Sequence, residues 1–366
     1  MECKPLKEVA QIIMGQSPDS SSYNEVGEGL PFFQGNADFG VMYPSERIWC
    51  NQPKKIANEN DILISVRAPI GALNYANKKC CIGRGLAAIT VKNPVERNYI
   101  FHLLKAKNAE LNRQGTGSTF KAIGKIVLED ILVPIVSSET QLHITRLMDI
   151  TESIISKRKK ELKYYDELIK ARFVEMFGDP ISNQKKWKVV KIGDIVKDVR
   201  YGTSRPAVEG GKYPYLRMNN LTVDGQIDLT DLKYIDIPES EIEKCIVRKG
   251  DVLFNRTNSV ELVGKTALFN LPDEMVIAGY IIRLRLNKDL RPEILSQYLN
   301  LKPLKDILRS MAKGAVNQAN INAKELQNIR VYLPEMELQN AFVVFAHQVD
   351  KSKVMKRLRL STNSFC

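Results

Sequence analysis

The sequence is poor in the residues that commonly carry catalysis or hold metals. It has three histidines among 366 residues. His102, His143 and His347 fall in helical patterns far from any nucleophile motif, which favours packing or surface roles. The six cysteines are scattered without a C-x-x-C pair, which is typical of a reduced protein without structural zinc. We therefore expect no catalytic residue, no metal site and a cytoplasmic location.

Long apolar runs are also missing. Nothing approaches the ~18 consecutive apolar residues of a membrane-spanning helix. The amino terminus lacks a basic segment followed by an uninterrupted apolar one. We expect neither a membrane span nor a signal peptide.

Motifs for nucleotide cofactors are absent as well. No glycine-rich loop follows a strand, and no Asn-Pro-Pro-aromatic tetrapeptide of the methyltransferase type occurs. Gly115-Thr116-Gly117-Ser118 is not a P-loop, because the lysine comes only at Lys121 and no G-K-[ST] ending follows. An enzyme that acts alone has no positive support, and we expect the chain to hold no cofactor of its own.

Positive charge is in excess. Lysine and arginine number 54 against 42 aspartates and glutamates, which gives a formal net charge of +12. Such an excess favours a polyanionic partner, because each cation placed against a phosphate releases condensed counterions. Charge alone does not separate this interpretation from a basic protein without such a partner.

The two halves of the chain contain the same ordered landmarks. Each half has a short amphipathic segment that ends on glycine, a proline-aromatic-polar segment, a strand that ends in arginine, a polar loop and a strand that ends in proline. The period is about 190 residues, which is the size of a whole domain rather than of a solenoid repeat. The matching segments are Leu6–Gly15 and Ile192–Gly202, Pro31–Asn36 and Pro214–Asn219, Asn60–Arg67 and Gly250–Arg256, Gly115–Ser118 and Gly314–Asn317, and Ile131–Pro134 and Val331–Pro334.

Within each half, short strand-like runs broken by Gly, Pro and Asn precede the helical patterns, which lie around Tyr99–Leu111 and Glu293–Leu308. This order predicts two homologous α+β domains with irregular sheets. We place them at residues 1–138 and 187–334.

Residues 139–179 predict a long helix between the two domains. The segment has almost no Gly or Pro, and apolar residues recur every seven positions at Met148, Ile155, Leu162 and Ile169. Gly178-Asp179-Pro180 supplies the expected stop. At 1.5 Å per residue, ~39 residues span roughly 58 Å, so the helix would act as a spacer.

A second, shorter helix is predicted over 335–366. Phe342, Phe345 and Val349 belong to its apolar stripe, and we expect it to pair with the first helix as an antiparallel coiled coil. An ordinary pair of core helices is the alternative. The predicted pairing residues are Met148, Ile155, Leu162, Ile169, Phe342, Phe345 and Val349.

This layout resembles the specificity subunits of type I restriction-modification systems. The resemblance rests on the duplicated signal at Asp61-Ile62-Leu63 and Gly250-Asp251-Val252-Leu253, on the strand-proline-helix junctions at Pro134 and Pro334, and on the helix end Lys163–Pro180. It implies that each domain is a target-recognition domain that reads one half of a bipartite, asymmetric site on double-stranded DNA. The second helix departs from the family pattern, because it is short and lacks an EMFG-like ending.

The same resemblance implies partners for the chain. The helices would set the spacing between half-sites and dock two methyltransferase subunits, which restriction-translocase subunits can join. S-adenosylmethionine would be bound by the methyltransferase, and adenine methylation and DNA cleavage would be the work of the partners.

Candidate DNA contacts are the polar and basic residues that end the repeated landmarks. Amide side chains pair well with adenine and arginine pairs well with guanine, whereas lysines beside glycine loops suit phosphates. The candidates for base edges are Gln34, Asn36, Arg217, Asn219 and Asn220; Arg67 and Arg256 end equivalent strands; Lys121, Lys125, Lys313, Asn317 and Gln318 flank the loops.

Two other classes of protein stay open at this point. A stand-alone double-stranded DNA-binding regulator would be expected to show a helix-turn-helix signal, which we do not find. A coiled-coil adaptor without nucleic acid would not explain the duplicated polar landmarks or the net charge.

Overall fold

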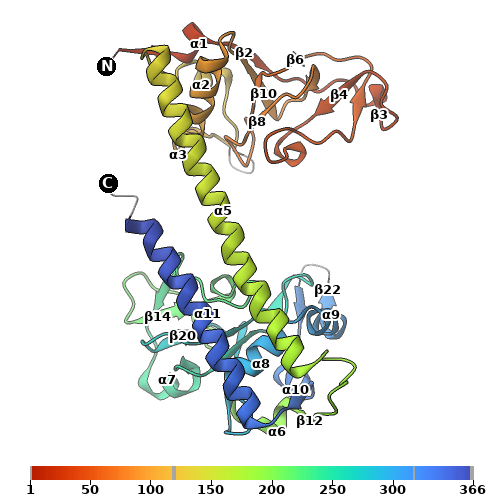
Figure 1. Ribbon diagram of the computed structural model, residues 1–366, viewed down its shortest axis with the longest axis vertical. Coiled ribbons are helices and arrows are strands. Elements are labelled where there is room, and N and C mark those ends of the chain that lie inside the picture. The colour runs from red at the N-terminus through yellow and green to blue at the C-terminus, as the bar shows by residue number, and fades with distance from the viewer. Residues whose placement is uncertain (1, 118–120, 316–317, 363–366) are drawn as a thin grey trace. The chain divides into compact units, whose positions relative to one another are not determined.

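The computed structural model describes residues 2–117, 121–315 and 318–362, without the side chains of 313–315, 318 and 354–362. The chain forms two compact units, Met1–Arg158 (unit 1) and Lys159–Cys366 (unit 2). The helix α5 (Ser138–Phe177) runs from one unit into the other (Figure 1). The sequence predicted this helix over 139–179, so the predicted start is one residue late and the predicted end two residues late.

Unit 1 is built on two small sheets and a closing strand pair. One sheet has the order β2-β10-β7-β8 and the other the order β3-β5-β4-β9-β6, while β1 pairs with β11. The strands are β1 (Cys3–Pro5), β2 (Gln11–Met14), β3 (Tyr23–Asn24), β4 (Leu30–Phe33), β5 (Trp49–Cys50), β6 (Ile56–Ala57), β7 (Ile62–Ser65), β8 (Leu73–Tyr75), β9 (Cys80–Ile82), β10 (Leu86–Thr90) and β11 (Leu132–Pro134).

Unit 2 repeats this plan. Its sheets have the orders β13-β21-β17-β19 and β15-β14-β20-β16, and β12 pairs with β24. A further small sheet has the order β18-β23-β22. The strands are β12 (Lys188–Lys191), β13 (Val196–Tyr201), β14 (Tyr213–Leu216), β15 (Lys233–Ile235), β16 (Ile246–Val247), β17 (Val252–Asn255), β18 (Thr257–Asn258), β19 (Thr266–Leu268), β20 (Met275–Ile277), β21 (Ile281–Leu286), β22 (Lys313–Ala315), β23 (Gln318–Asn320) and β24 (Arg330–Leu333).

The internal repeat predicted from the landmarks is confirmed in the order of the main sheet and in the pairing of the first and last strands. Each unit contains one parallel pair in the same position, β4 with β9 and β14 with β20, among antiparallel neighbours. Irregular sheets and late helices make both units α+β, as predicted.

The late helical patterns each form two helices. Asn93 caps α2 (Pro94–Ala106) by accepting from the Val95 amide, and α3 (Asn108–Gln114) follows Lys107 directly. In unit 2, α9 (Lys302–Met311) follows α8 (Pro292–Leu299) and carries Pro303 in its first turn. The shorter helices are α1 (Leu6–Val9), α4 (Lys125–Glu129), α6 (Ile192–Ile195), α7 (Glu239–Cys245) and α10 (Ala323–Gln327).

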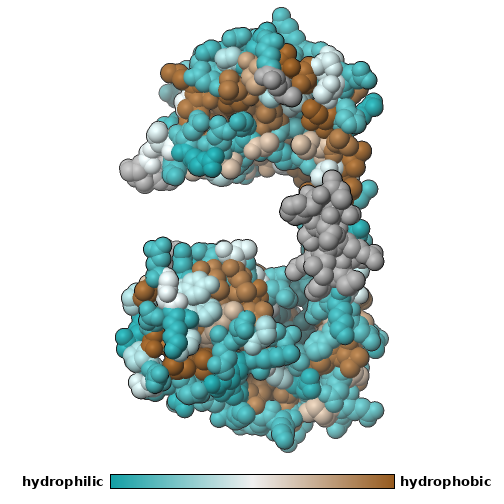
Figure 2. All heavy atoms as spheres, turned by 90° about the vertical axis from the view of Figure 1, so that its left-hand side faces the viewer, coloured by the Kyte–Doolittle hydropathy of each residue, from teal (hydrophilic) through white to brown (hydrophobic). Residues whose placement is uncertain are grey.

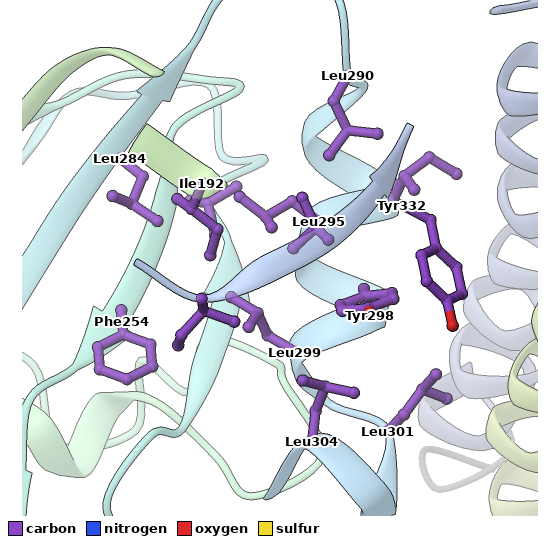
Figure 3. Close-up of a cluster of buried hydrophobic side chains, with 14 of the residues drawn as sticks. Ile192, Phe254, Leu284, Leu290, Leu295, Tyr298, Leu299, Leu301, Leu304 and Tyr332 are labelled. Carbon is purple, nitrogen blue, oxygen red and sulfur yellow. The ribbon is translucent and has the colours of Figure 1, made fainter. Parts of the chain in front are cut away.

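The largest hydrophobic core lies in unit 2. Phe254 and Leu284 from the sheet, Leu295 and Leu299 from α8 and Tyr332 from β24 converge there (Figure 3). Each large side chain that is fully buried contributes about 1.5–3 kcal/mol relative to exposure. The core therefore fixes α8 and β24 against the main sheet.

The duplicated aspartate of the "D-I/V-L" signal closes a turn in both units. The Oδ2 atom of Asp61 accepts from the Asn58 amide at 2.7 Å, and that of Asp251 accepts from the Arg248 amide at 2.9 Å. Both aspartates are buried, so each satisfies a backbone donor that water would not reach. The motif thus has a structural role at the start of a central strand.

The helix α11 (Met336–Thr362) packs antiparallel to the part of α5 that lies in unit 2. The Phe342 ring is 5.2 Å from that of Phe173, and the Lys353 ammonium is 2.6 Å from the Asp166 carboxylate. Residue numbers increase along α5 while those of the contacting residues on α11 decrease, so the two helices run in opposite directions. Ile169, Phe342 and Phe173 belong to the main core, so the pair is also part of the domain.

The predicted pairing residues have different surroundings. Ile169, Phe342 and Val349 are buried in unit 2, and Leu162 and Phe345 are half-buried. Met148 and Ile155, in unit 1, are 45% and 44% exposed. Helix pairing through these two residues stays a prediction.

Candidate nucleic-acid interface

Four loops of unit 2 surround a concave site of about 510 Å³. Three of these loops follow β13, β14 and β17, and the fourth precedes β21. Three predicted contact residues, Arg217, Asn219 and Arg256, line it together. Arg205 and Tyr280 line it too, and the sequence analysis did not identify them.

Arg256 is held over an aromatic ring at the edge of this site. Its guanidinium carbon lies 4.9 Å from the centre of the Tyr201 ring. Its backbone amide donates to the Tyr280 carbonyl at 2.9 Å. Its Nε atom is buried and has no hydrogen-bond partner among the described residues, so ligand contacts would come from the terminal nitrogens of the guanidinium group.

Arg217 and Arg205 are each oriented by a carboxylate. Arg217 donates to Asp231 at 2.7 Å, and Arg205 binds both oxygens of Glu241 at 2.7 and 3.2 Å. Hydrogen bonds from these arginines lower the pKa of Asp231 and of Glu241, so both acids are charged at neutral pH. The carboxylates pre-orient the guanidinium groups at the concave surface.

Asn219 and Asn220 have different roles although they are adjacent. Asn219 lines the concave site. Asn220 is 2% exposed; its Oδ1 accepts from the Arg217 amide at 2.9 Å and its Nδ2 donates to the Asp228 carbonyl at 2.8 Å. As placed here, Asn220 shapes the loop and has no free face for a base.

The candidates of unit 1 occupy equivalent loops. Gln34 is exposed directly after β4, and Asn36 is half-buried at the start of a short 3-10 turn. The carboxylate of Asp38 accepts from the Gln34 amide at 2.7 Å, so it organises this loop as Asn220 organises the other.

Arg67 is exposed and joined through the backbone to the segment of Lys121. Arg67 forms an isolated bridge with Ala122, and the Ala68 amide donates to the Lys121 carbonyl at 3.1 Å. Lys125 begins α4 and pairs with Glu129 at 3.2 Å. The backbone segments of Arg67 and Lys121, which the sequence analysis placed at a strand end and beside a loop, thus lie next to each other.

The corresponding hairpin of unit 2 lies next to Arg256. β18 follows Arg256 directly and pairs with β23, and the Ile321 amide donates to the Arg256 carbonyl at 2.9 Å. The predicted contacts Lys313 and Gln318 are on the backbone of β22 and β23, but their side chains and all of Asn317 lie outside the described residues.

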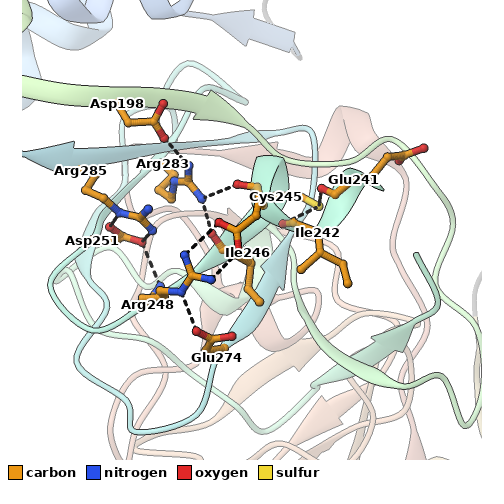
Figure 4. A network of polar contacts seen from close by, with 11 residues as sticks. Asp198, Glu241, Ile242, Cys245, Ile246, Arg248, Asp251, Glu274, Arg283 and Arg285 are labelled. Carbon is orange, nitrogen blue, oxygen red and sulfur yellow. Dashed lines mark hydrogen bonds and ion pairs between the residues drawn. The ribbon is translucent and has the colours of Figure 1, made fainter. Parts of the chain in front are cut away.

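A network of ion pairs and hydrogen bonds joins β13, β17 and β21, the strands next to the loops of the site (Figure 4). The buried Arg283 of β21 binds Asp198 of β13 and the carbonyl of Ile246. Although burial alone would raise it, the hydrogen bond and charge of Arg283 hold the pKa of Asp198 below its ordinary value. Arg285 binds both oxygens of Asp251 at 2.7 and 2.8 Å. These contacts tie the strands that lead into the concave site.

The surface of both units is largely hydrophilic, with hydrophobic residues scattered on the visible face (Figure 2). Among the described residues, no three His, Cys, Asp or Glu side chains gather as a metal site. In the part of the chain that the structure covers, no helix combines the length and apolarity needed to cross a membrane.

Comparison with known proteins gives a consistent result. The family described as "Type I restriction modification DNA specificity domain" matches residues 1–164 and 184–360. A Methanocaldococcus jannaschii protein with the name type I restriction enzyme MjaX specificity subunit is 45% identical over 152 residues, 41% of this chain and 36% of the relative. The EcoKI specificity subunit of Escherichia coli K12 is 22% identical over 283 residues, 72% of this chain and 61% of that protein.

The chain thus spans less than two thirds of either relative's length. A crystal structure of a type I restriction-modification system S subunit from M. genitalium superposes with a TM-score of 0.50 at 17% identity. The match covers 99% of this chain and 92% of that one, and at this identity it shows a shared fold.

Proposed function

Because the chain belongs to the type I restriction-modification DNA specificity domain family, we propose that it recognises double-stranded DNA as the specificity subunit of a type I complex. The concave site of unit 2 is the observation that carries the proposal. It presents Arg205, Arg217 and Arg256 beside Asn219 on loops, in a chain with a net charge of +12. Arginine and asparagine are the side chains that best read guanine and adenine edges.

Each unit reads one half of a bipartite site. The loops after β4 and β14 are structurally equivalent but carry different residues, with Gln34 in one where Arg217 stands in the other. Different side chains at equivalent positions select different bases, so the complete target is asymmetric. Arg67, Lys121 and Lys125 of unit 1, and Lys313, Asn317 and Gln318 of unit 2, contact phosphates and position the domains.

The helices serve as spacer and docking surface. We assign the recognition domains to residues 1–138 and 187–334, and the spacer and docking segments to 139–179 and 335–366. Met148 and Ile155 form an exposed apolar face of α5 in unit 1, which is available to a partner. Two methyltransferase subunits dock on the helices, restriction-translocase subunits join them in the cytoplasm, and the methyltransferase binds S-adenosylmethionine. The chain itself performs no chemistry.

Co-purification with type I methyltransferase subunits, followed by mapping of methylated adenines, tests the proposal. We expect modification in both halves of a bipartite motif. In that complex, Arg217→Ala should relax selectivity at one base pair at a cost of about 1–3 kcal/mol. Lys288→Ala should not, because Lys288 is exposed and lies beyond the end of β21 that is away from the site. Specific DNA binding without any complex would favour a stand-alone regulator instead, and a complex that shows no DNA binding would favour the adaptor.

A further inference from the structure

A second pocket of unit 2, of about 310 Å³, is strongly basic and shares no residue with the concave site. It lies between α5, the loop that precedes β19 and the first turns of α9. Glu261 is the one acidic residue in its described lining. The cations that line it are Lys170, Lys265, Lys302, Lys305 and Arg309.

Two of these ammonium groups are held by carbonyl oxygens instead of carboxylates. Lys265 is 7% exposed and donates to the Met218 carbonyl at 2.6 Å, and Lys305 donates to the Gly264 carbonyl at 2.6 Å. Within the described residues neither forms a salt bridge. Asp306 pairs with Lys302 and Arg309, but it is not part of the lining. The buried Lys265, and to a lesser degree the half-buried Lys305, are costly without a counter-charge, so the pocket favours an anion.

The electrostatics support this inference. Burial, together with repulsion from Arg309, Lys170 and Lys265, lowers the pKa of Lys305 to about 7. Burial lowers the pKa of Lys265 too. A bound anion would relieve both effects.

The fold itself does not require these charges. Gly71 of unit 1 and Gly264 of unit 2 occupy the same turn with positive φ, 83° and 80°. In unit 1 the neutral amide of Asn108 donates to the Gly71 carbonyl at 2.9 Å, where Lys305 does so in unit 2. Ala72 follows Gly71, whereas Lys265 follows Gly264. One copy therefore forms the same turn without either lysine.

We propose that this basic pocket binds a phosphate group. A phosphate has up to two negative charges and several acceptor oxygens, which matches a pocket lined by several cations better than a single carboxylate does. The amino terminus of α9 at Lys302 adds the positive end of a helix dipole. The phosphate comes either from a free ion or from the DNA backbone.

Titration of the full chain with inorganic phosphate, followed by ³¹P NMR in a buffer of constant ionic strength at pH 6.5, tests the site. We expect saturable binding of one equivalent, weakened at least tenfold in Lys305→Asn, which copies Asn108. Lys170→Met should weaken binding likewise. Because this variant keeps the bonds from Lys305 to Gly264 and from Lys265 to Met218, it still tests the site if Lys305→Asn does not fold. Lys324→Asn, on the exposed surface of α10, is the matched control and should bind as the wild type.

A parallel titration with duplex DNA identifies the source. If the DNA backbone occupies the pocket, duplex displaces inorganic phosphate and Lys305→Asn weakens duplex binding; if a free ion occupies it, neither happens. Both results support a phosphate site. Absence of saturable binding, binding that both variants leave unchanged, or preference for a glutamate-rich peptide over phosphate would overturn it. The phosphate titration needs no DNA, so its failure would leave the proposed function intact.

Discussion

The ammonium of Lys353 on α11 lies 2.6 Å from the carboxylate of Asp166 on α5. Lys353 also bonds to Asp350 at 2.9 Å and is only 8% exposed. Although burial lowers it, the bonds to both aspartates leave the pKa of Lys353 above its ordinary value. This ion pair lies at the end of the helix contact opposite to the edge-to-face pair of Phe173 and Phe342.

Removal of one partner should therefore weaken the helix pair. We expect Asp166→Asn to lower the free energy of unfolding of unit 2 by about 1–3 kcal/mol, because Lys353 is left buried with one acid fewer. Urea unfolding followed by Trp187 fluorescence in a Trp49→Phe background measures unit 2. Glu167→Gln breaks the exposed Lys163–Glu167 pair on the same helix and should cost less than about 0.5 kcal/mol. Equal costs would contradict a special role for Lys353.

The equivalent aspartates Asp61 and Asp251 should differ in their effect on stability. Both close a turn, but Asp251 also binds Arg285 through two hydrogen bonds. Asp251→Asn should cost roughly 2–4 kcal/mol because it leaves Arg285 without its partner, and Asp61→Asn about 1 kcal/mol. Chemical denaturation of each variant checks this order. A larger cost at Asp61 would refute the account.

Lys305 should make the stability of unit 2 depend on pH. Its pKa is about 7 in the folded protein and about 10.4 in an unfolded chain. Between these values the unfolded chain binds more protons, so stability rises with pH across the window. Below pH 7 the folded protein bears the full cost of the buried charge.

Lys305→Met should flatten this dependence. The loss of the bond to Gly264 costs about 1 kcal/mol at any pH, but the gain in stability between pH 6.5 and 9.5 should shrink by roughly 1–3 kcal/mol. Urea unfolding in phosphate-free buffers at several pH values provides the measurement. Wild-type and variant curves that run parallel would show that Lys305 is not the titrating group.

Asn219 and Asn220 give a matched test of the recognition loop. Asn220→Ala should destabilise unit 2 by about 1–2 kcal/mol, because the Arg217 amide and the Asp228 carbonyl lose their partner. Asn219→Ala should leave the free energy of unfolding within about 0.5 kcal/mol of the wild type. It should instead reduce affinity for the DNA target that methylation mapping identifies. Thermal unfolding and DNA affinity, measured on both variants, separate the two roles; the reverse pattern would mean that the loop rearranges on DNA.

The sequence predicted the repeat, the long helix and part of the concave site because these depend on local patterns. Arg217 and Arg256 end landmarks that recur, and heptads mark α5. Arg205 and Tyr280 escaped prediction because they meet only through the pairing of β13 with β21, which no local pattern encodes.

The environment of individual polar residues was also beyond a local pattern. Nothing in the amino-acid sequence distinguishes the exposed Asn219 from the buried Asn220. Lys305 lies in a helical pattern like any surface lysine, and its burial follows from tertiary packing against the turn at Gly264.

The pairing of first and last strands gives each copy a self-contained frame. β1 is hydrogen-bonded to β11 over Cys3–Pro5, and β12 to β24 over Lys188–Lys191. The chain therefore enters and leaves each copy at neighbouring points, and the intervening segment has no need of the rest of the protein to close its sheet. We therefore expect such a segment to be exchangeable: a different reader between the same two strands, if it packs against the same helix residues, should change what is read while the junctions to the helices stay as they are.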